Sequence, residues 1–161
     1  MLFRSARLVD INGDGRPEFL PNTLTSVNWY ELTARSPKVT WQRRELGKQG
    51  VGHGVGVGDI NGNGKLDIIT SKGWYQQPAD EHSDDWKFHP EFELGRAGIL
   101  ILGEDFDGDG DFDLLTSTWD PSGPMHYFEN DGAGVFKDRT KQSGLTGITG
   151  GINMVQADFD N

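Results

Sequence analysis

Residues 104–115 read EDFDGDGDFDLL, which places six carboxylates within ten residues and two large apolar residues directly after them. The same phrase occurs as DINGDGRPE from Asp10, as DINGNGKLD from Asp59 and as DFDGDGDFD from Asp105. A fourth copy, DFDN, starts at Asp158. The copies are about fifty residues apart, and a period of this size is typical of propeller blades or large solenoid turns.

Each copy is surrounded by β-prone segments in the same order. The first segment of each repeat precedes the phrase, at residues 6–9, 54–58, 99–103 and 153–157. The second follows the phrase directly, at 19–20, 66–71 and 112–117. The third lies at 27–32, 73–77 and 125–130, and the fourth at 39–46, 86–94 and 134–140. Their Val, Ile and aromatic residues favour strands, and Gly, Pro, Asp and Asn separate them. No segment keeps a 3.6-residue apolar period, so no long helix is expected.

Four strands per repeat predict an all-β fold, a partial β-propeller with about three four-stranded blades plus the first strand of a fourth. The 161 residues form one domain, with blades at approximately 1–48, 49–97 and 98–150 and the start of the next blade at 151–161. Because propellers need roughly four to eight blades to close, we expect the chain to be a piece of a longer propeller protein. The alternative is that open arcs associate into a ring.

The residue types within the phrase predict a calcium loop. Side chains at positions 1, 3 and 5 converge only where the backbone curls around a point, and the glycine at position 6 permits that turn. Five or six hard oxygens around one point is the coordination that Ca²⁺ prefers, and the cation offsets the carboxylate repulsion. The predicted ligands at positions 1, 3, 5, 7 (carbonyl) and 9 are Asp10, Asn12, Asp14, Arg16 and Glu18; Asp59, Asn61, Asn63, Lys65 and Asp67; and Asp105, Asp107, Asp109, Asp111 and Asp113, with Asp158 and Asp160 in the fourth copy.

Two other interpretations of the phrase are weaker. An EF-hand needs a bidentate Glu at position 12 and helices on both sides. Position 12 is Pro21, Thr70 or Thr116 here, and the flanks are β-prone. A solvated Asp/Gly turn explains a single copy, but not three copies with matched flanks.

Composition limits the partners. The net charge of −10 argues against nucleic acid and anionic membrane and suits a cation. The chain has no cysteine, so it forms neither a disulfide nor a thiolate metal site. Its longest apolar run, residues 99–102, is far too short to span a bilayer.

The phrase D-x-D/N-x-D/N-G-x-x-D/E, at this period and before a short apolar strand, resembles the FG-GAP/VCBS repeat family, the calcium-bearing blades of integrin-α-type β-propellers. YFENDGAGVFKDRTKQSGL (127–145) and GGINMVQADFDN (150–161) resemble bacterial members. Glu18 replaces the usual Asp at position 9, and the second loop has Asn at positions 3 and 5. The resemblance implies loop-bound calcium, an extracellular, periplasmic or cell-surface location with a signal peptide upstream, and a binding role.

Two functions follow from these observations. The first is a calcium-binding scaffold for adhesion to, or binding of, a protein or glycan ligand through loops at one face. The alternative is the propeller domain of a carbohydrate-active enzyme of the lyase or dehydratase type, which residues 52–78 faintly resemble. For that enzyme we expect His53 and an Arg or carboxylate together at the channel mouth. We also expect self-association through open strand edges.

Overall fold

The computed structural model of the chain describes residues 6–95, 97–149 and 151, and these residues form twelve strands and no helix. The all-β expectation is therefore confirmed. The predicted ligands Asp158 and Asp160 and the predicted strand at 153–157 lie outside the described residues. In the described ranges, then, there is no helical segment that could cross a bilayer.

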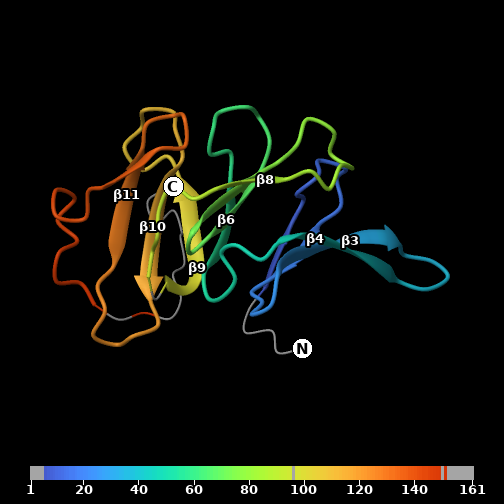
Figure 1. Cartoon of the computed structure of the whole chain (residues 1–161), viewed down its shortest axis with the longest axis horizontal. Coiled ribbons are helices and arrows are strands. Elements are labelled where there is room, and N and C mark those ends of the chain that lie inside the picture. Colours follow the sequence, from blue (N-terminus) through green and yellow to red (C-terminus); the bar gives the residue numbers. More distant parts are fainter. Residues whose placement is uncertain (1–5, 96, 150, 152–161) are drawn as a thin grey trace, which may run out of the picture.

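Blade 1 is a four-stranded antiparallel sheet in the order of the sequence (Figure 1). Its strands are β1 (Ala6–Val9), β2 (Glu18–Pro21), β3 (Val27–Ala34) and β4 (Thr40–Gly47). All four lie close to the segments expected from the aromatic and β-branched residues. The hairpin of β3 and β4 extends furthest from the other blades.

Blades 2 and 3 repeat this order of strands. Blade 2 contains β5 (Val55–Gly58), β6 (Asp67–Thr70), β7 (Gly73–Gln76) and β8 (Lys87–His89). Blade 3 contains β9 (Ala97–Glu104), β10 (Asp113–Thr118), β11 (His126–Asn130) and β12 (Phe136–Asp138).

The outer strands of blades 2 and 3 are shorter than the sequence pattern predicts. The aromatic segment 86–94 forms a strand only over Lys87–His89. Pro90 follows directly, and proline has no N–H to donate to a sheet ladder. The segment 134–140 forms a strand only over Phe136–Asp138, after which the Asp138 carboxylate accepts the N–H of Thr140 at 2.9 Å.

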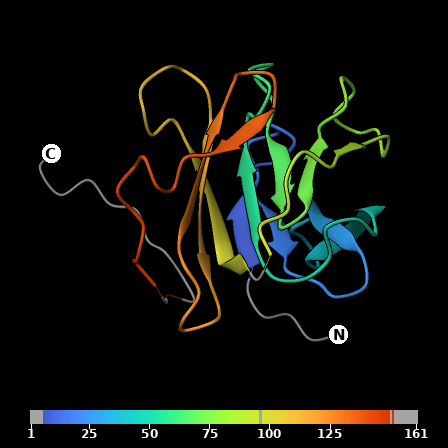
Figure 2. The same cartoon turned by 60° about the vertical axis from the view of Figure 1, so that its left-hand side comes forward.

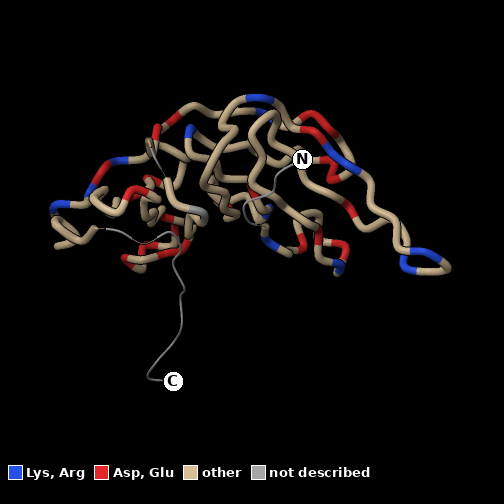
Figure 3. The backbone as a smooth tube through the Cα atoms, turned by 90° about the horizontal axis from the view of Figure 1, so that it is seen from below, with Lys and Arg blue, Asp and Glu red and all other residues tan. Residues whose placement is uncertain are grey.

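Blades 2 and 3 share one eight-stranded sheet, because their innermost strands β5 and β9 pair in parallel at Val55 and Leu100. Gly56 permits this approach, since a Cβ there would lie 2.5 Å from the carbonyl oxygen of Ile101. Figure 2 shows the strands of the two blades standing side by side. Seen from below, the three blades follow an arc (Figure 3).

The hydrophobic core lies between neighbouring blades. One cluster joins blade 1 to blade 2 and includes Leu20, Trp29, Ile68 and Tyr75. A second joins blade 2 to blade 3 and includes Ile69, Trp74, Ile101 and Leu114. Each blade is therefore stabilised mainly by the next one, as in other repeat architectures. The fold is a partial β-propeller.

Candidate functional site

The three described copies of the phrase form three loops at the same edge of the arc, the upper edge in Figure 1. Each loop connects the first strand of its blade to the second, over residues 10–17, 59–66 and 105–112. We refer to them as the first, second and third loops. Because the loops are equivalent in the fold, they can be compared position by position.

The position 1 carboxylate closes each loop by accepting the N–H of the position 6 glycine. The distances to the carboxylate oxygens of Asp10, Asp59 and Asp105 are 2.8, 2.6 and 3.1 Å. This contact folds the backbone of each loop around the position 1 carboxylate.

Position 5 makes a tight turn in all three loops. Its side-chain oxygen accepts the N–H two residues further on, at 2.8 Å for Asp14, 2.8 Å for Asn63 and 3.0 Å for Asp109. Position 3 accepts in the same way in the first and third loops, at 3.1 and 3.2 Å. Asp and Asn both make such turns, since each has a short side-chain oxygen.

The glycines are required by backbone conformation and not by lack of space. At position 6, φ is +80° for Gly15, +83° for Gly64 and +98° for Gly110. A Cβ at any of the three would meet no atom within 4 Å. L-residues rarely adopt such φ values, so glycine is what lets the loop curl.

Position 9 lies behind each loop, in the first residue of the second strand. Glu18, Asp67 and Asp113 are each 0% exposed. Glu18 accepts the N–H of Ile11 at 2.8 Å, and Asp67 accepts that of Ile60 at 3.1 Å. The carboxylates of Glu18 and Asp67 therefore anchor their loops to the blade, and burial raises the pKa of Glu18 and raises that of Asp67 to about 7.

The third loop brings its carboxylates closest together. One oxygen from each of Asp105, Asp107 and Asp109 lies within 4.8 Å of the others, and all three residues are exposed. Loss of solvation and then the charges of neighbouring carboxylates raise the pKa of Asp107 and of Asp111. Asp113 is not part of this group, because its two oxygens accept the N–H of Asn130 at 2.9 Å and the hydroxyl of Tyr127 at 2.6 Å.

The first two loops also contain oxygens suited to a cation. In the described part of the chain, one oxygen each of Asp10, Glu18 and Asn61 is buried without a hydrogen-bond partner. A buried acceptor in this state costs free energy, and a hard cation at the loop would satisfy it. The residues present therefore fit Ca²⁺, although the complete ligand set stays a prediction.

The side chains at position 7 contact other groups of the protein. Arg16 pairs with Asp14 at 3.2 Å, and Lys65 donates to the carbonyl of Ala79 at 3.0 Å. Only the carbonyls of these residues are predicted as ligands, so the side-chain contacts do not test that prediction. Asp111 is approached by the β11–β12 turn, where a Cβ on Gly132 would lie 2.5 Å from its carboxylate.

The sequence pattern missed residues that support the loops from the third strand of each blade. The N–H of Gln77 donates to Asp67 at 2.9 Å, as that of Asn130 does to Asp113. Gln77 directly follows β7 and Asn130 is the last residue of β11, so a repeat alignment of the third strands could have found them. Neither has a spacing relative to the phrase that indicates metal chemistry.

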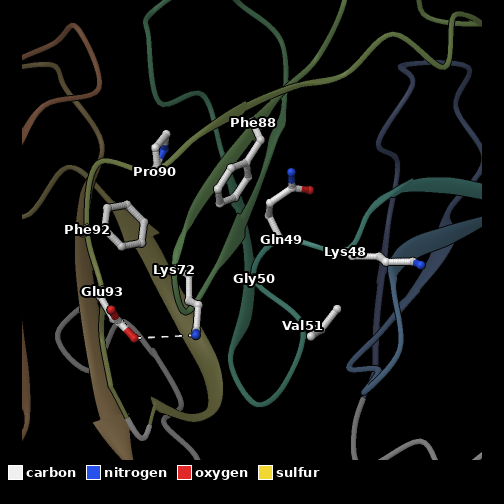
Figure 4. A pocket seen from close by; sticks show the side chains of 9 residues that line it. All are labelled: Lys48, Gln49, Gly50, Val51, Lys72, Phe88, Pro90, Phe92 and Glu93. Carbon is white, nitrogen blue, oxygen red and sulfur yellow. Dashed lines mark ion pairs between the residues drawn. The ribbon is translucent and has the colours of Figure 1, made fainter.

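A cavity of about 610 Å³ lies at the opposite edge of the arc, where β4 continues into β5 and β8 into β9. Its lining includes the rings of Phe88 and Phe92 and an ion pair of Lys72 and Glu93 at 3.6 Å (Figure 4). His53, a residue considered for catalysis, has its ring centroid 6.2 Å from that of Trp119.

Comparison with known proteins identifies the repeat. The sequence profile of the FG-GAP-like repeat matches residues 10–70 and 105–161, which together are well over half of the chain. No curated protein matches the sequence, and no solved structure matches it.

Proposed function

The chain belongs to the FG-GAP-like repeat family, and we propose that its loops bind Ca²⁺ and hold together a β-propeller scaffold that binds a protein or glycan. The proposed location is extracellular, periplasmic or at the cell surface, where calcium is abundant enough for modules with dissociation constants of about 10⁻⁴ to 10⁻³ M. The observation that carries the proposal is the third loop, where three exposed carboxylates converge within 4.8 Å.

The residues that would hold the cation are the predicted ligands at positions 1, 3, 5, 7 and 9 of each loop. A bound Ca²⁺ supplies positive charge that offsets the carboxylate repulsion. The chain itself contributes the position 1 contact to the position 6 glycine, which keeps the loop curled. It also contributes the buried position 9 carboxylate, which connects the loop to the core.

Melting curves in chelator and in about 10 mM calcium test the proposal, since about 10 mM is a hundredfold excess over a dissociation constant of about 10⁻⁴ M. A cation that binds the native loops and not the unfolded chain stabilises by about 2.7 kcal/mol per site at a hundredfold excess over the dissociation constant. For a chain of this size that corresponds to a rise in Tm of about 5–10 °C. Magnesium at the same concentration is the control and should have little effect. Equal curves in chelator and calcium would reject the proposal.

The partner surface that we propose is the edge opposite the loops. The cavity there combines two phenylalanine rings with a Lys72–Glu93 pair, a mixture of apolar and charged groups that suits protein or glycan. Binding to a glycan array should fall for Phe88→Ala and Phe92→Ala but not for the exposed Trp41→Ala on β4. Turnover of a bound glycan in the same samples would favour the enzyme alternative.

A further inference from the structure

The two interfaces between blades are built from the same three positions. The residue at position 2 of the phrase, the residue at position 11 and the strand partner of position 11 form the face that each blade presents to the next one. In blade 1 these are Ile11, Leu20 and Trp29, and in blade 2 they are Ile60, Ile69 and Trp74. All six are at most 2% exposed, because the next blade covers them.

A side-chain amide connects the blades at the same place in both interfaces. The amide nitrogen of Gln77 in blade 2 donates to the carbonyl of Ile11 in blade 1 at 2.8 Å. The amide nitrogen of Asn130 in blade 3 donates to the carbonyl of Ile60 in blade 2 at 2.9 Å. Gln77 and Asn130 are 4% and 3% exposed, so both contacts are shielded from water.

Contacts within its own blade orient the side-chain amide of Gln77 and of Asn130. The backbone N–H of the same residue donates to the position 9 carboxylate, Asp67 for Gln77 and Asp113 for Asn130. In blade 3 the amide oxygen of Asn130 also accepts the N–H of Gly134 at 3.0 Å. The contact between the amide of one blade and the position 2 carbonyl of the preceding blade is called the clasp below.

Blade 3 presents the same face with no blade against it in the described ranges. Its three equivalent residues are Phe106, Leu115 and Tyr127, and together they line a cavity of about 320 Å³. Phe106 is 41% exposed, whereas its counterparts Ile11 and Ile60 are 2% and 1% exposed. Leu145, from the segment after β12, also lines this cavity.

We propose that the face of blade 3 formed by Phe106, Leu115 and Tyr127 is a docking surface for a further blade of the same repeat that carries Asn or Gln at the position of Gln77 and Asn130. The amide of that blade donates to the carbonyl of Phe106, and its apolar strands cover the Phe106 ring. The two internal interfaces supply the template, since each covers the equivalent residues in this way.

Blade 1 of a second copy does not meet this requirement. The register of β2 and β3 places Leu32 at the position of the amide, since Phe19 pairs with Tyr30 as Ile68 pairs with Tyr75. Leucine has no amide to donate, and it would leave the carbonyl of Phe106 desolvated without a partner. The surface therefore selects an amide-bearing blade over blade 1 of another copy.

The experiment extends the full chain. Residues 63–97 are appended after Asn161, which completes the phrase that starts at Asp158 and adds a copy of Gln77. A matched extension carries Gln77→Leu in the appended copy only. The chain has no cysteine, so Ser143→Cys introduces one thiol at the wall of the cavity, and Ser36→Cys in the β3–β4 hairpin is the control.

The rate at which Ser143→Cys reacts with a thiol reagent reports whether the face is covered. We expect the extension to slow the reaction at least about tenfold and the Gln77→Leu extension to slow it much less, with Ser36→Cys unchanged in both. Equal slowing by the two extensions would overturn the role of the amide, and no slowing in either would overturn docking. Slowing that rises with concentration in the unextended chain would identify a second copy as the occupant and overturn the proposal.

A measurement on the unextended chain tests the clasp independently of whether the added blade folds. Gln77→Leu should lower Tm by about 2–6 °C, because the carbonyl of Ile11 loses its buried donor. If Tm does not change, the clasp contributes nothing to blade packing and the proposal is wrong.

Discussion

The second and third loops share two backbone contacts and differ strongly in charge. In both, the position 1 carboxylate accepts the N–H of the position 6 glycine, and position 5 accepts the N–H two residues on. Yet positions 3 and 5 are Asn61 and Asn63 in the second loop and Asp107 and Asp109 in the third. Asn63 makes the position 5 turn, and Asn12 makes the position 3 turn in the first loop, so the shape of the loop does not require a carboxylate at either position.

This difference separates what the loop needs for folding from what it needs for binding. An amide oxygen makes the same turn as a carboxylate without adding charge. The third loop nevertheless holds one oxygen from each of three carboxylates within 4.8 Å, and loss of solvation and then the charges of Asp113 and Asp109 raise the pKa of Asp107. Folding of the loop does not need these negative charges, so we infer that they serve to bind a ligand. A divalent cation is the simplest ligand of this kind.

The largest effect on calcium affinity should come from removing the position 1 carboxylate of a loop. Asp105→Ala should weaken the tightest calcium-binding phase by about a hundredfold, because the most charged loop loses a ligand, whereas Asp59→Ala should leave that phase intact. The two variants are matched structurally, since each aspartate accepts two backbone N–H groups within its loop. Isothermal titration with calcium measures the difference. If Asp59→Ala removes the tightest phase instead, loop rigidity and not charge decides the affinity.

A smaller effect should follow from giving the third loop the side chains of the second. The double variant Asp107→Asn/Asp109→Asn should keep the loop folded, because Asn makes the position 5 turn in the second loop and the position 3 turn in the first. We expect calcium affinity to fall about tenfold and Tm in chelator to rise, since two mutually repelling charges are gone. Calcium titration and melting in chelator check both outcomes. A fall in Tm in chelator would show that the carboxylates stabilise the loop itself. The inference that the third loop carries charge for binding and not for folding would then be wrong.

Much of this architecture could be predicted from the sequence, because its causes are local. The order of acidic, amide and glycine residues determines the turns of each loop, and the aromatic and β-branched segments determine most of the strands. The predicted strand at residues 27–32, for example, forms β3 over Val27–Ala34. Where a local rule was overlooked, as with Pro90 after β8, the prediction was wrong by several residues.

The contacts between blades could not be predicted in the same way. The clasp joins residues 66 and 70 positions apart, and it exists only because neighbouring blades pack at a particular offset. Nothing in the local pattern distinguishes Gln77 from the adjacent Gln76. The dual role of position 9 was missed for the same reason, because Asp67 and Asp113 were considered only as ligands while the third strand donates to both.

The smallest effect concerns the aromatic residues at equivalent positions in the third strands of blades 2 and 3. At equivalent positions, Tyr127 donates to Asp113 in blade 3, whereas Trp74 in blade 2 stacks on His89, with ring centroids 4.1 Å apart and an interplanar angle of 8°. Loss of solvation and then the charge of Lys87 lower the pKa of His89. A base with a lowered pKa folds best when neutral, so its contribution is present above the unfolded pKa of about 6.5 and is lost as pH falls through the lower folded pKa.

We therefore expect stability in chelator to fall more, or rise less, for the wild type than for the variant His89→Asn between about pH 7 and pH 5, while protonation of the buried carboxyls of Glu18 and Asp67 stabilises both proteins over the same interval. The difference between the two pH profiles isolates the histidine, because carboxylate titrations are common to both proteins. Tm measured at half-unit steps of pH gives the profiles, with His82→Asn, an exposed-loop histidine before β8, as the control. Parallel profiles for the wild type and His89→Asn would mean that protonated His89 still packs on Trp74. The difference between the two blades at this position would then rest on the hydroxyl that Tyr127 donates to Asp113.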